Sequence, residues 1–95
     1  MRDLRWLITG GTGSLGQELT RQILADFEPR TVRIFSRGEL AQYKMKQEMP
    51  DSKLRFLIGD IRDRNRLYRA MHKVDIVLHC AALKHVPICE YNPIE

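Results

Sequence analysis

A glycine-rich stretch after a short hydrophobic run constrains the fold of this chain more than any other feature. Residues 4–9 have the apolar character of a buried strand, and glycines occupy positions 10, 11, 13 and 16 directly after it. Ser14 and Gln17, three residues apart, have the pattern of a capping box, which predicts that a helix begins inside this stretch. A strand, a glycine turn and a helix in this order predict the first unit of an α/β domain.

The glycine spacing is typical of a dinucleotide-binding turn. Gly11-x-Gly13-x-x-Gly16 has one form of the fingerprint, and Gly10-x-x-Gly13-x-x-Gly16 has the spacing of short-chain dehydrogenases. One glycine allows the tight turn, another lets a pyrophosphate approach the backbone, and the third allows close packing of helix and strand. Amide groups at the helix start, aided by the helix dipole, would face the phosphates. A mononucleotide P-loop is excluded because Gln17 stands where that loop needs a lysine.

Strand and helix patterns alternate over the rest of the chain. We expect helices at residues 14–27, 39–49 and 63–72, and further strands at residues 31–35, 54–58 and 74–79. This β-α-β-α-β-α-β order predicts the amino-terminal part of a doubly wound, Rossmann-type NAD(P)-binding domain with a parallel sheet and right-handed crossovers. Asn92-Pro93 has the sequence of a further helix start. We therefore expect residues 1–95 to be a partial domain that lacks a substrate domain.

Composition argues against several classes of protein. The chain is 43% hydrophobic and 29% charged, as in a globular domain, and it holds no run long enough to cross a membrane. With no visible secretory signal and no disulfide framework from two cysteines, we expect a cytoplasmic location. The net charge is +4, and arginines gather between residues 62 and 69. Because Tyr68 is the one aromatic residue among them, this row predicts a solvated face rather than a nucleic-acid surface.

The residues after the second strand favour one dinucleotide over the other. Ligands of a doubly wound sheet bind at the carboxyl ends of its strands, and an NAD site usually has Asp or Glu after the second strand. Here Ser36 and Arg37 stand at that position. A guanidinium group and a hydroxyl group suit the 2′-phosphate of NADP. We expect NADP rather than NAD, with a solvated Arg37 as the alternative.

Asp60 and Ile61 follow the third strand, so they should lie at the same edge of the sheet as Ser36 and Arg37. The Asp60 carboxylate could accept a hydrogen bond from the adenine amino group while Ile61 lies against the ring. Alternatively, Asp60 only caps the following turn, with Asp63 capping the next helix. The two roles are compatible.

Three further stretches carry a family resemblance. They are SRGEL at residues 36–40, GDIRD at residues 59–63 and AALKHVPICEYNP at residues 81–93. With the glycine motif, they resemble the polysaccharide-biosynthesis branch of the extended short-chain dehydrogenases. That branch includes UDP-N-acetylglucosamine 4,6-dehydratases and related epimerases that make capsule or flagellin-glycan sugars. The resemblance covers practically the whole chain, and the last stretch is far more specific than the glycine motif.

The resemblance implies a role for each part of the cofactor site. Residues 12–15 would line the pyrophosphate, residues 36–40 would surround the adenosine phosphate, and Asp60 and Ile61 would contact the adenine. Cys80 would lie on the nicotinamide side, and Lys84 would lie between the cofactor and a nucleotide-sugar substrate, although a solvated loop lysine is the alternative. The cofactor-binding residues expected from the motifs and the resemblance are Gly10, Thr12, Gly13, Ser14, Leu15, Gly16, Ser36, Arg37, Gly38, Glu39, Leu40, Asp60, Ile61, Cys80, Ala81 and Lys84.

No catalytic residue is expected within these 95 residues. By the resemblance, related enzymes oxidise the sugar at C4 with NADP, eliminate water across C5 and C6, and return the hydride to C6. This chemistry needs a Tyr-x-x-x-Lys pair, and the dehydratases add an Asp-Lys pair. Each tyrosine lacks the lysine four residues on: Tyr43 is followed by Gln47, Tyr68 by His72 and Tyr91 by Glu95.

We therefore expect an inactive NADP-binding portion of a homo-oligomeric nucleotide-sugar enzyme. The alternatives are a non-catalytic NADP-binding regulatory module and a basic interaction protein without a cofactor. We expect no metal, because the spacing of the histidines and cysteines matches no zinc pattern: His79, Cys80, His85 and Cys89.

Overall fold

The computed structural model of the protein describes residues 2–83 and 86–93, with side chains for residues 2–80. Within these residues, the elements in chain order are β1 (Arg5–Thr9), α1 (Ser14–Asp26), β2 (Thr31–Ser36), α2 (Glu39–Glu48), β3 (Leu54–Ile58), α3 (Arg64–Met71), β4 (Ile76–Leu83) and β5 (Val86–Pro93). The alternation through β4 confirms the predicted α/β class. From β1 to α3, every observed boundary lies within one residue of the predicted one.

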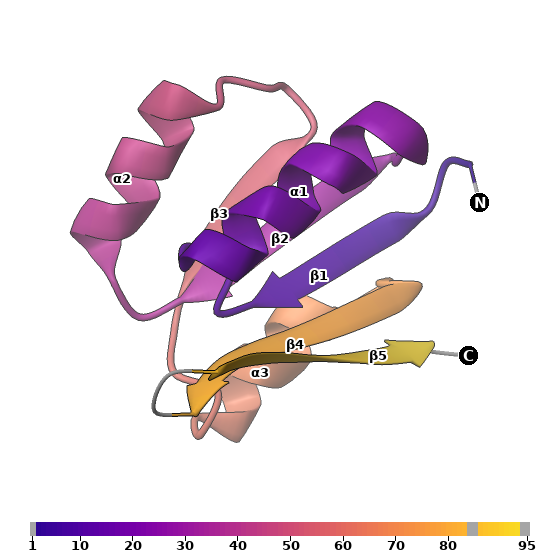
Figure 1. Cartoon of the computed structure of the whole chain (residues 1–95). Coiled ribbons are helices and arrows are strands. Elements are labelled where there is room, and N and C mark those ends of the chain that lie inside the picture. Colours follow the sequence, from indigo (N-terminus) through magenta and orange to yellow (C-terminus); the bar gives the residue numbers. More distant parts are fainter. Residues whose placement is uncertain (1, 84–85, 94–95) are drawn as a thin grey trace.

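The strands form one sheet in the order β3-β2-β1-β4-β5. β1 pairs in parallel with β2 and β4, and β2 pairs in parallel with β3. Figure 1 shows α1 and α2 on one face of this sheet and α3 on the other. The order of the four parallel strands confirms the Rossmann-type arrangement, in which the chain reverses its direction of winding between β1 and β4.

The central strands β1 and β2 and the described part of β4 are largely buried on both faces, because their side chains alternate between two cores. Leu7 of β1 faces α3 and packs with Phe35, Ala70 and Val77. Its neighbour Ile8 faces the opposite way. That second core lies under α1 and α2 and includes Trp6, Ile8, Ile23, Val32, Ile34, Met45, Leu54, Ile76 and Leu78. Continuous hydrophobic runs in the sequence therefore correspond to strands that are covered by helices on both sides.

The end of the chain differs from the prediction. The strand expected to end at residue 79 continues to Leu83 as β4, and β5 runs antiparallel beside it. The helix start expected at Asn92-Pro93 is wrong, because both residues belong to β5. Pro87 and Pro93 lack the amide proton that a central strand needs. β5 is the outer strand of the sheet, and an edge strand accommodates proline.

None of the helices within the described residues is long and apolar enough to cross a membrane.

Candidate functional site

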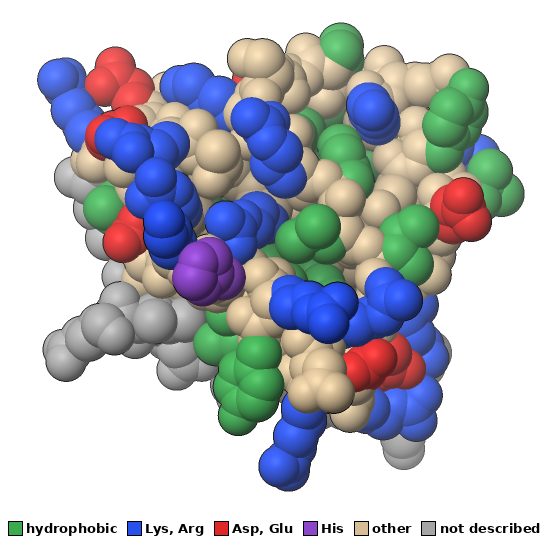
Figure 2. Space-filling view, turned by 180° about the vertical axis from the view of Figure 1, so that it is seen from behind, with side chains coloured by type: hydrophobic (Ala, Val, Ile, Leu, Met, Phe, Trp, Pro, Cys, Tyr) green, Lys and Arg blue, Asp and Glu red, His purple; other side chains and the backbone are tan. Residues whose placement is uncertain are grey.

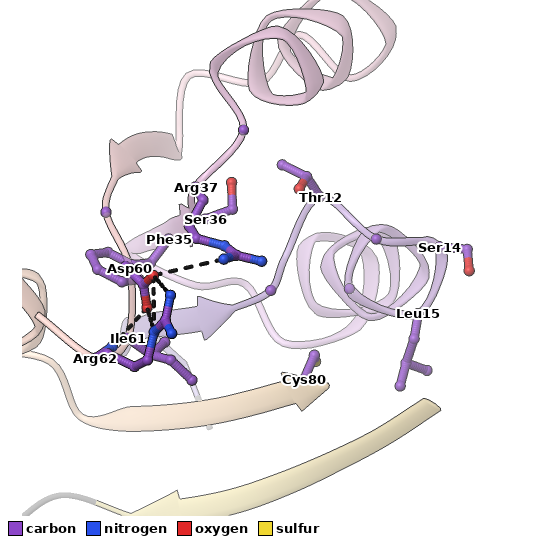
Figure 3. A pocket seen from close by; sticks show the side chains of 15 residues that line it. Thr12, Ser14, Leu15, Phe35, Ser36, Arg37, Asp60, Ile61, Arg62 and Cys80 are labelled. Carbon is purple, nitrogen blue, oxygen red and sulfur yellow. Dashed lines mark hydrogen bonds and ion pairs between the residues drawn. The ribbon is translucent and has the colours of Figure 1, made fainter. Parts of the chain in front are cut away.

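A pocket of about 1040 Å³ lies at the carboxyl ends of the central strands. Figure 3 shows Arg37, Asp60 and Arg62 grouped at one end of it, and Leu15 and Cys80 at the other. Its lining combines the glycine turn, the start of α1 and the ends of β2 and β3. The residues are Gly10, Thr12, Gly13, Ser14, Leu15, Gly16, Phe35, Ser36, Arg37, Gly38, Gly59, Asp60, Ile61, Arg62 and Cys80.

Most of the residues expected to bind a cofactor lie around this pocket. Glu39 and Leu40 do not line it; they are exposed residues in the first turn of α2. The side chains of Ala81 and Lys84 lie outside the described part of the chain. The structure therefore brings together four separate stretches of sequence, as expected for the switch edge of a doubly wound sheet.

Two of the glycines are required by the fold itself. Gly10 has a φ of +68°, and a Cβ atom there would lie 2.3 Å from the carbonyl oxygen of Cys80. At Gly16, a Cβ atom would lie 2.5 Å from the Cα atom of Gly11. These contacts are with backbone atoms, which cannot rotate away. Gly10 therefore allows the turn, and Gly16 allows α1 to pack tightly against it.

Gly13 is different, because the protein itself does not require a glycine there. Its φ of −71° and ψ of 168° are open to any residue. The nearest atom to an added Cβ would be the carbonyl oxygen of Gly10, at an ordinary contact distance of 3.5 Å. The side chain would stand at the wall of the pocket. The missing Cβ thus leaves space for a ligand to approach the backbone at the start of α1.

α1 begins inside the glycine stretch, as predicted, but without a capping box. The N-cap is Gly13, and the cap makes no side-chain hydrogen bond. The Gln17 side chain instead donates to the carbonyl oxygen of Thr12 over 2.8 Å, and the Gln17 amide donates to Gly13. Ser14 is therefore the first helical residue rather than the cap. The amides of the first turn have no acceptor within the helix, so they form an anion-binding end of the kind that dinucleotide sites use.

The end of β2 presents a hydroxyl and a guanidinium group to the pocket. Ser36 is buried, and its Oγ accepts a hydrogen bond of 2.9 Å from Nε2 of Gln42. The same Nε2 donates to the carbonyl oxygen of Leu57 over 2.8 Å, which ties α2 to β3. Because Gln42 occupies a lone pair of Ser36, the Ser36 hydroxyl proton is available to another acceptor. Gln42 was not predicted from the sequence, where the only sign of its role is that a polar residue lies on the inner face of α2.

The end of β3 carries a carboxylate that is held by arginine. Oδ1 of Asp60 accepts from the backbone amide of Arg62 at 2.9 Å, and Oδ2 accepts from NH2 of Arg62 at 2.8 Å. These hydrogen bonds, with the charge of Arg62, lower the pKa of Asp60 to about 2. Asp60 therefore caps its turn, as the sequence suggested. Its contact with adenine stays a prediction.

The arginines of residues 62–69 are all exposed, as predicted, but two of them also make contacts near the pocket. Arg62 lies before α3 and lines the pocket, which the sequence analysis missed although Asp60-x-Arg62 is a spacing that allows a local ion pair. Arg66 donates to the carbonyl oxygen of Ile58, and its amide donates to the N-cap residue Asp63. Asp63 thus caps α3 as predicted. Figure 2 shows lysine and arginine side chains spread over the face seen from behind, with acidic side chains between them.

Histidine and cysteine residues near the pocket have ordinary structural contacts. Nδ1 of His79 lies 3.0 Å from Oγ1 of Thr9 on the neighbouring strand. Cys80 is half-buried within β4, rather than in a loop after it. Among the side chains of residues 2–80, no group of three His, Cys, Asp or Glu residues could hold a metal ion. The side chains of His85 and Cys89 lie outside that range.

Sequence comparison relates this chain to known proteins. The profile of a family described as polysaccharide biosynthesis protein matches residues 6–95. The UDP-N-acetylglucosamine 4,6-dehydratase (inverting) of Campylobacter jejuni is 49% identical over 94% of this chain and 27% of its own length. The UDP-glucose 4-epimerase of Rickettsia canadensis is 47% identical over 98% of this chain and 28% of its own length. An uncharacterized membrane protein of Methanocaldococcus jannaschii is 49% identical over 99% of this chain and 28% of its own length.

Two solved structures are also similar to this chain. Pen from Bacillus thuringiensis superposes with a TM-score of 0.82 at 44% identity, covering 90% of this chain and 26% of that one. The Bordetella bronchiseptica enzyme WbmG, in complex with NAD, superposes with a TM-score of 0.67 at 26% identity, covering 85% and 26%. The chain spans just over a quarter of the length of the curated relatives it matches. On these matches, and as its motifs indicated, the chain belongs to the polysaccharide biosynthesis protein family.

Proposed function

We propose that this chain is the NADP-binding portion of a UDP-N-acetylhexosamine 4,6-dehydratase or epimerase that makes sugars for surface polysaccharides or flagellin glycans. One observation carries the proposal. The amides at the start of α1 and the Ser36-Arg37 pair at the end of β2 line the same pocket. The first group suits a diphosphate and the second suits a further phosphate on the adenosine ribose.

The choice of NADP depends on Arg37. The WbmG structure holds NAD, which supports a nicotinamide dinucleotide in a related fold. In this chain, the residue that would read the 2′-hydroxyl of NAD is replaced by an arginine whose side chain is 74% exposed. A guanidinium group binds a phosphate dianion through charge-assisted hydrogen bonds. A carboxylate at the same position would repel the phosphate.

The residues of the pocket fit the parts of this cofactor. The open backbone at Gly13 would admit the pyrophosphate, and the Ser36 hydroxyl and Arg37 would bind the 2′-phosphate. Ile61, 54% exposed, offers an apolar surface to the adenine ring. When bound, NADP supplies the hydride chemistry; these residues bind and orient it. The contact of Lys84 with a nucleotide sugar, and the cytoplasmic location, stay predictions.

The dehydratase relative and the family description support a substrate of the UDP-N-acetylglucosamine class. The chain itself contains no Tyr-x-x-x-Lys pair. We therefore propose that it binds the cofactor and does not turn over substrate alone. The alternative is a non-catalytic NADP-binding regulatory module.

Calorimetric titration of the purified chain with NADP and NAD tests the binding proposal. Circular dichroism confirms beforehand that the protein is folded. We expect saturable binding of NADP and weaker binding of NAD, and no loss of water from UDP-N-acetylglucosamine by mass spectrometry. A folded protein that binds neither dinucleotide contradicts the proposal. Dehydration or epimerisation by a longer protein that carries this chain would favour the enzyme over the regulatory module.

A further inference from the structure

We propose that Arg62 is a positioning residue for the choice of cofactor: by pairing with Asp60, it leaves Arg37 free to bind the 2′-phosphate. This inference rests on the proposed function and explains how a pocket that contains a carboxylate at its adenosine end could still prefer NADP. It assigns a role to a residue that lies outside the glycine motif and outside the Ser36-Arg37 pair.

Three charged side chains meet at this end of the pocket. Figure 3 shows the guanidinium groups of Arg37 and Arg62 both directed at the carboxylate of Asp60. The Asp60 side chain is 28% exposed, so it is partly enclosed by its neighbours. An unpaired carboxylate here would repel a phosphate dianion. The affinity of this end of the pocket for the 2′-phosphate therefore depends on which arginine neutralises Asp60.

The distances assign Asp60 to Arg62. Nε of Arg62 lies 3.2 Å from both carboxylate oxygens, and NH2 lies 2.8 Å from Oδ2. NH1 of Arg37 lies 3.8 Å from Oδ2, close enough for an ion pair but beyond hydrogen-bonding distance. Arg62 thus makes a two-pronged pair with the carboxylate, while the donors of Arg37 remain available.

Removal of Arg62 should redirect Arg37. Asp60 stays ionised at neutral pH, so the nearest remaining cation would turn towards it. The three side chains together carry one net positive charge, whereas Arg37 and Asp60 alone carry none. NAD lacks the 2′-phosphate, so its affinity should be almost unaffected by this change. The signature of the positioning role is therefore a selective loss of NADP binding.

The test compares NADP and NAD affinities by calorimetry in four proteins. They are the wild type, Arg62→Ala, Arg62→Ala with Asp60→Asn, and the control Arg64→Ala. Arg64 is an exposed residue at the start of α3 that does not line the pocket, so its variant removes the same charge without touching the cluster.

We expect Arg62→Ala to weaken NADP binding by about tenfold and NAD binding by less than about twofold, in keeping with a partly exposed charged pair. Adding Asp60→Asn removes the competing carboxylate and should restore most of the lost NADP affinity. Arg64→Ala should change both affinities equally and slightly. If the double variant does not fold, Arg62→Lys gives the second measurement: it keeps the charge beside Asp60 and should lose less NADP affinity than Arg62→Ala.

Equal losses for the two dinucleotides in Arg62→Ala overturn the inference and leave the proposed function standing. The inference is also overturned if the double variant binds NADP as weakly as Arg62→Ala. That result would mean that Arg62 contacts the phosphate directly, since removal of Asp60 could not replace such a contact. A wild-type protein that binds neither dinucleotide overturns the proposed function and this inference together.

Discussion

Gly13 and Gly16 should separate ligand binding from folding, although they are three residues apart in the same motif. A side chain at Gly13 meets only the Gly10 carbonyl oxygen at 3.5 Å, whereas a side chain at Gly16 lies 2.5 Å from the backbone of Gly11. We therefore expect Gly13→Val to abolish cofactor binding in a folded protein. Gly16→Ala should destabilise the fold itself.

The magnitudes follow from these contacts. Replacing the N-cap Gly13 by valine costs at most about 1 kcal/mol of capping. The valine would keep the phosphates from the helix amides, and two charge-assisted hydrogen bonds at about 1.5 kcal/mol each correspond to about 100-fold in affinity. Gly16→Ala gains about 1 kcal/mol in helix propensity but forces an overlap worth about 1–3 kcal/mol, so it should be destabilising overall. For a domain of this size, 1 kcal/mol shifts Tm by about 4–8 °C.

Thermal unfolding and calorimetry on the same samples measure both effects. The expected profile for Gly13→Val is a Tm no more than about 8 °C below the wild type and NADP binding at least about 100-fold weaker. Gly16→Ala should unfold at a lower temperature without ligand. Wild-type NADP affinity in Gly13→Val would refute the reasoning, because it would mean that the diphosphate does not lie against the start of α1.

Three further perturbations test other parts of the account. Arg37→Ala should weaken NADP binding at least about tenfold more than NAD binding, since it removes a charged donor to the 2′-phosphate; equal losses in calorimetry would count against that role. Carbon-13 NMR titration of Asp60 should give a midpoint near the expected pKa of about 2. Because this folded pKa is below the unfolded value of 3.8, Asp60 stabilises the fold above about pH 4, and that contribution disappears as the pH falls towards 2. The Arg62→Ala variant should titrate closer to 3.8, and a wild-type midpoint already at 3.8 would contradict the ion pair. Arg33→Met should lower the free energy of unfolding by about 1–3 kcal/mol in urea, because NH1 of Arg33 donates to the carbonyl oxygens of Ala70 and His72 at the end of α3, both at 2.7 Å; an unchanged urea midpoint would show that these bonds contribute nothing.

The parallel core was predictable because its signals are local. Buried parallel strands are continuous apolar runs, and Pro29 and Pro50 mark where the first two helices have ended. The pocket followed from the same reasoning, since the ends of parallel strands meet at one edge. Ser36, Arg37 and Asp60 could be placed there from the order of the elements alone.

What the sequence did not reveal depends on contacts between distant segments or on the geometry of turns. β5 pairs antiparallel with β4 at the edge of the sheet, whereas no strand was predicted after residue 79. Arg62 was counted only as one of a row of solvated arginines, because its pairing with Asp60 depends on the turn before α3. Gln42 was missed because its partners, Ser36 and Leu57, lie on two different strands.

The central claim is that the backbone amides at the start of α1 bind the diphosphate of a nicotinamide dinucleotide. Nitrogen-15 NMR titration with NADP, compared with adenosine as a phosphate-free ligand, tests it most directly. We predict large shifts of the amide signals of residues 13–16 with NADP and almost none with adenosine. Binding of NADP that leaves these amides unchanged would contradict the account.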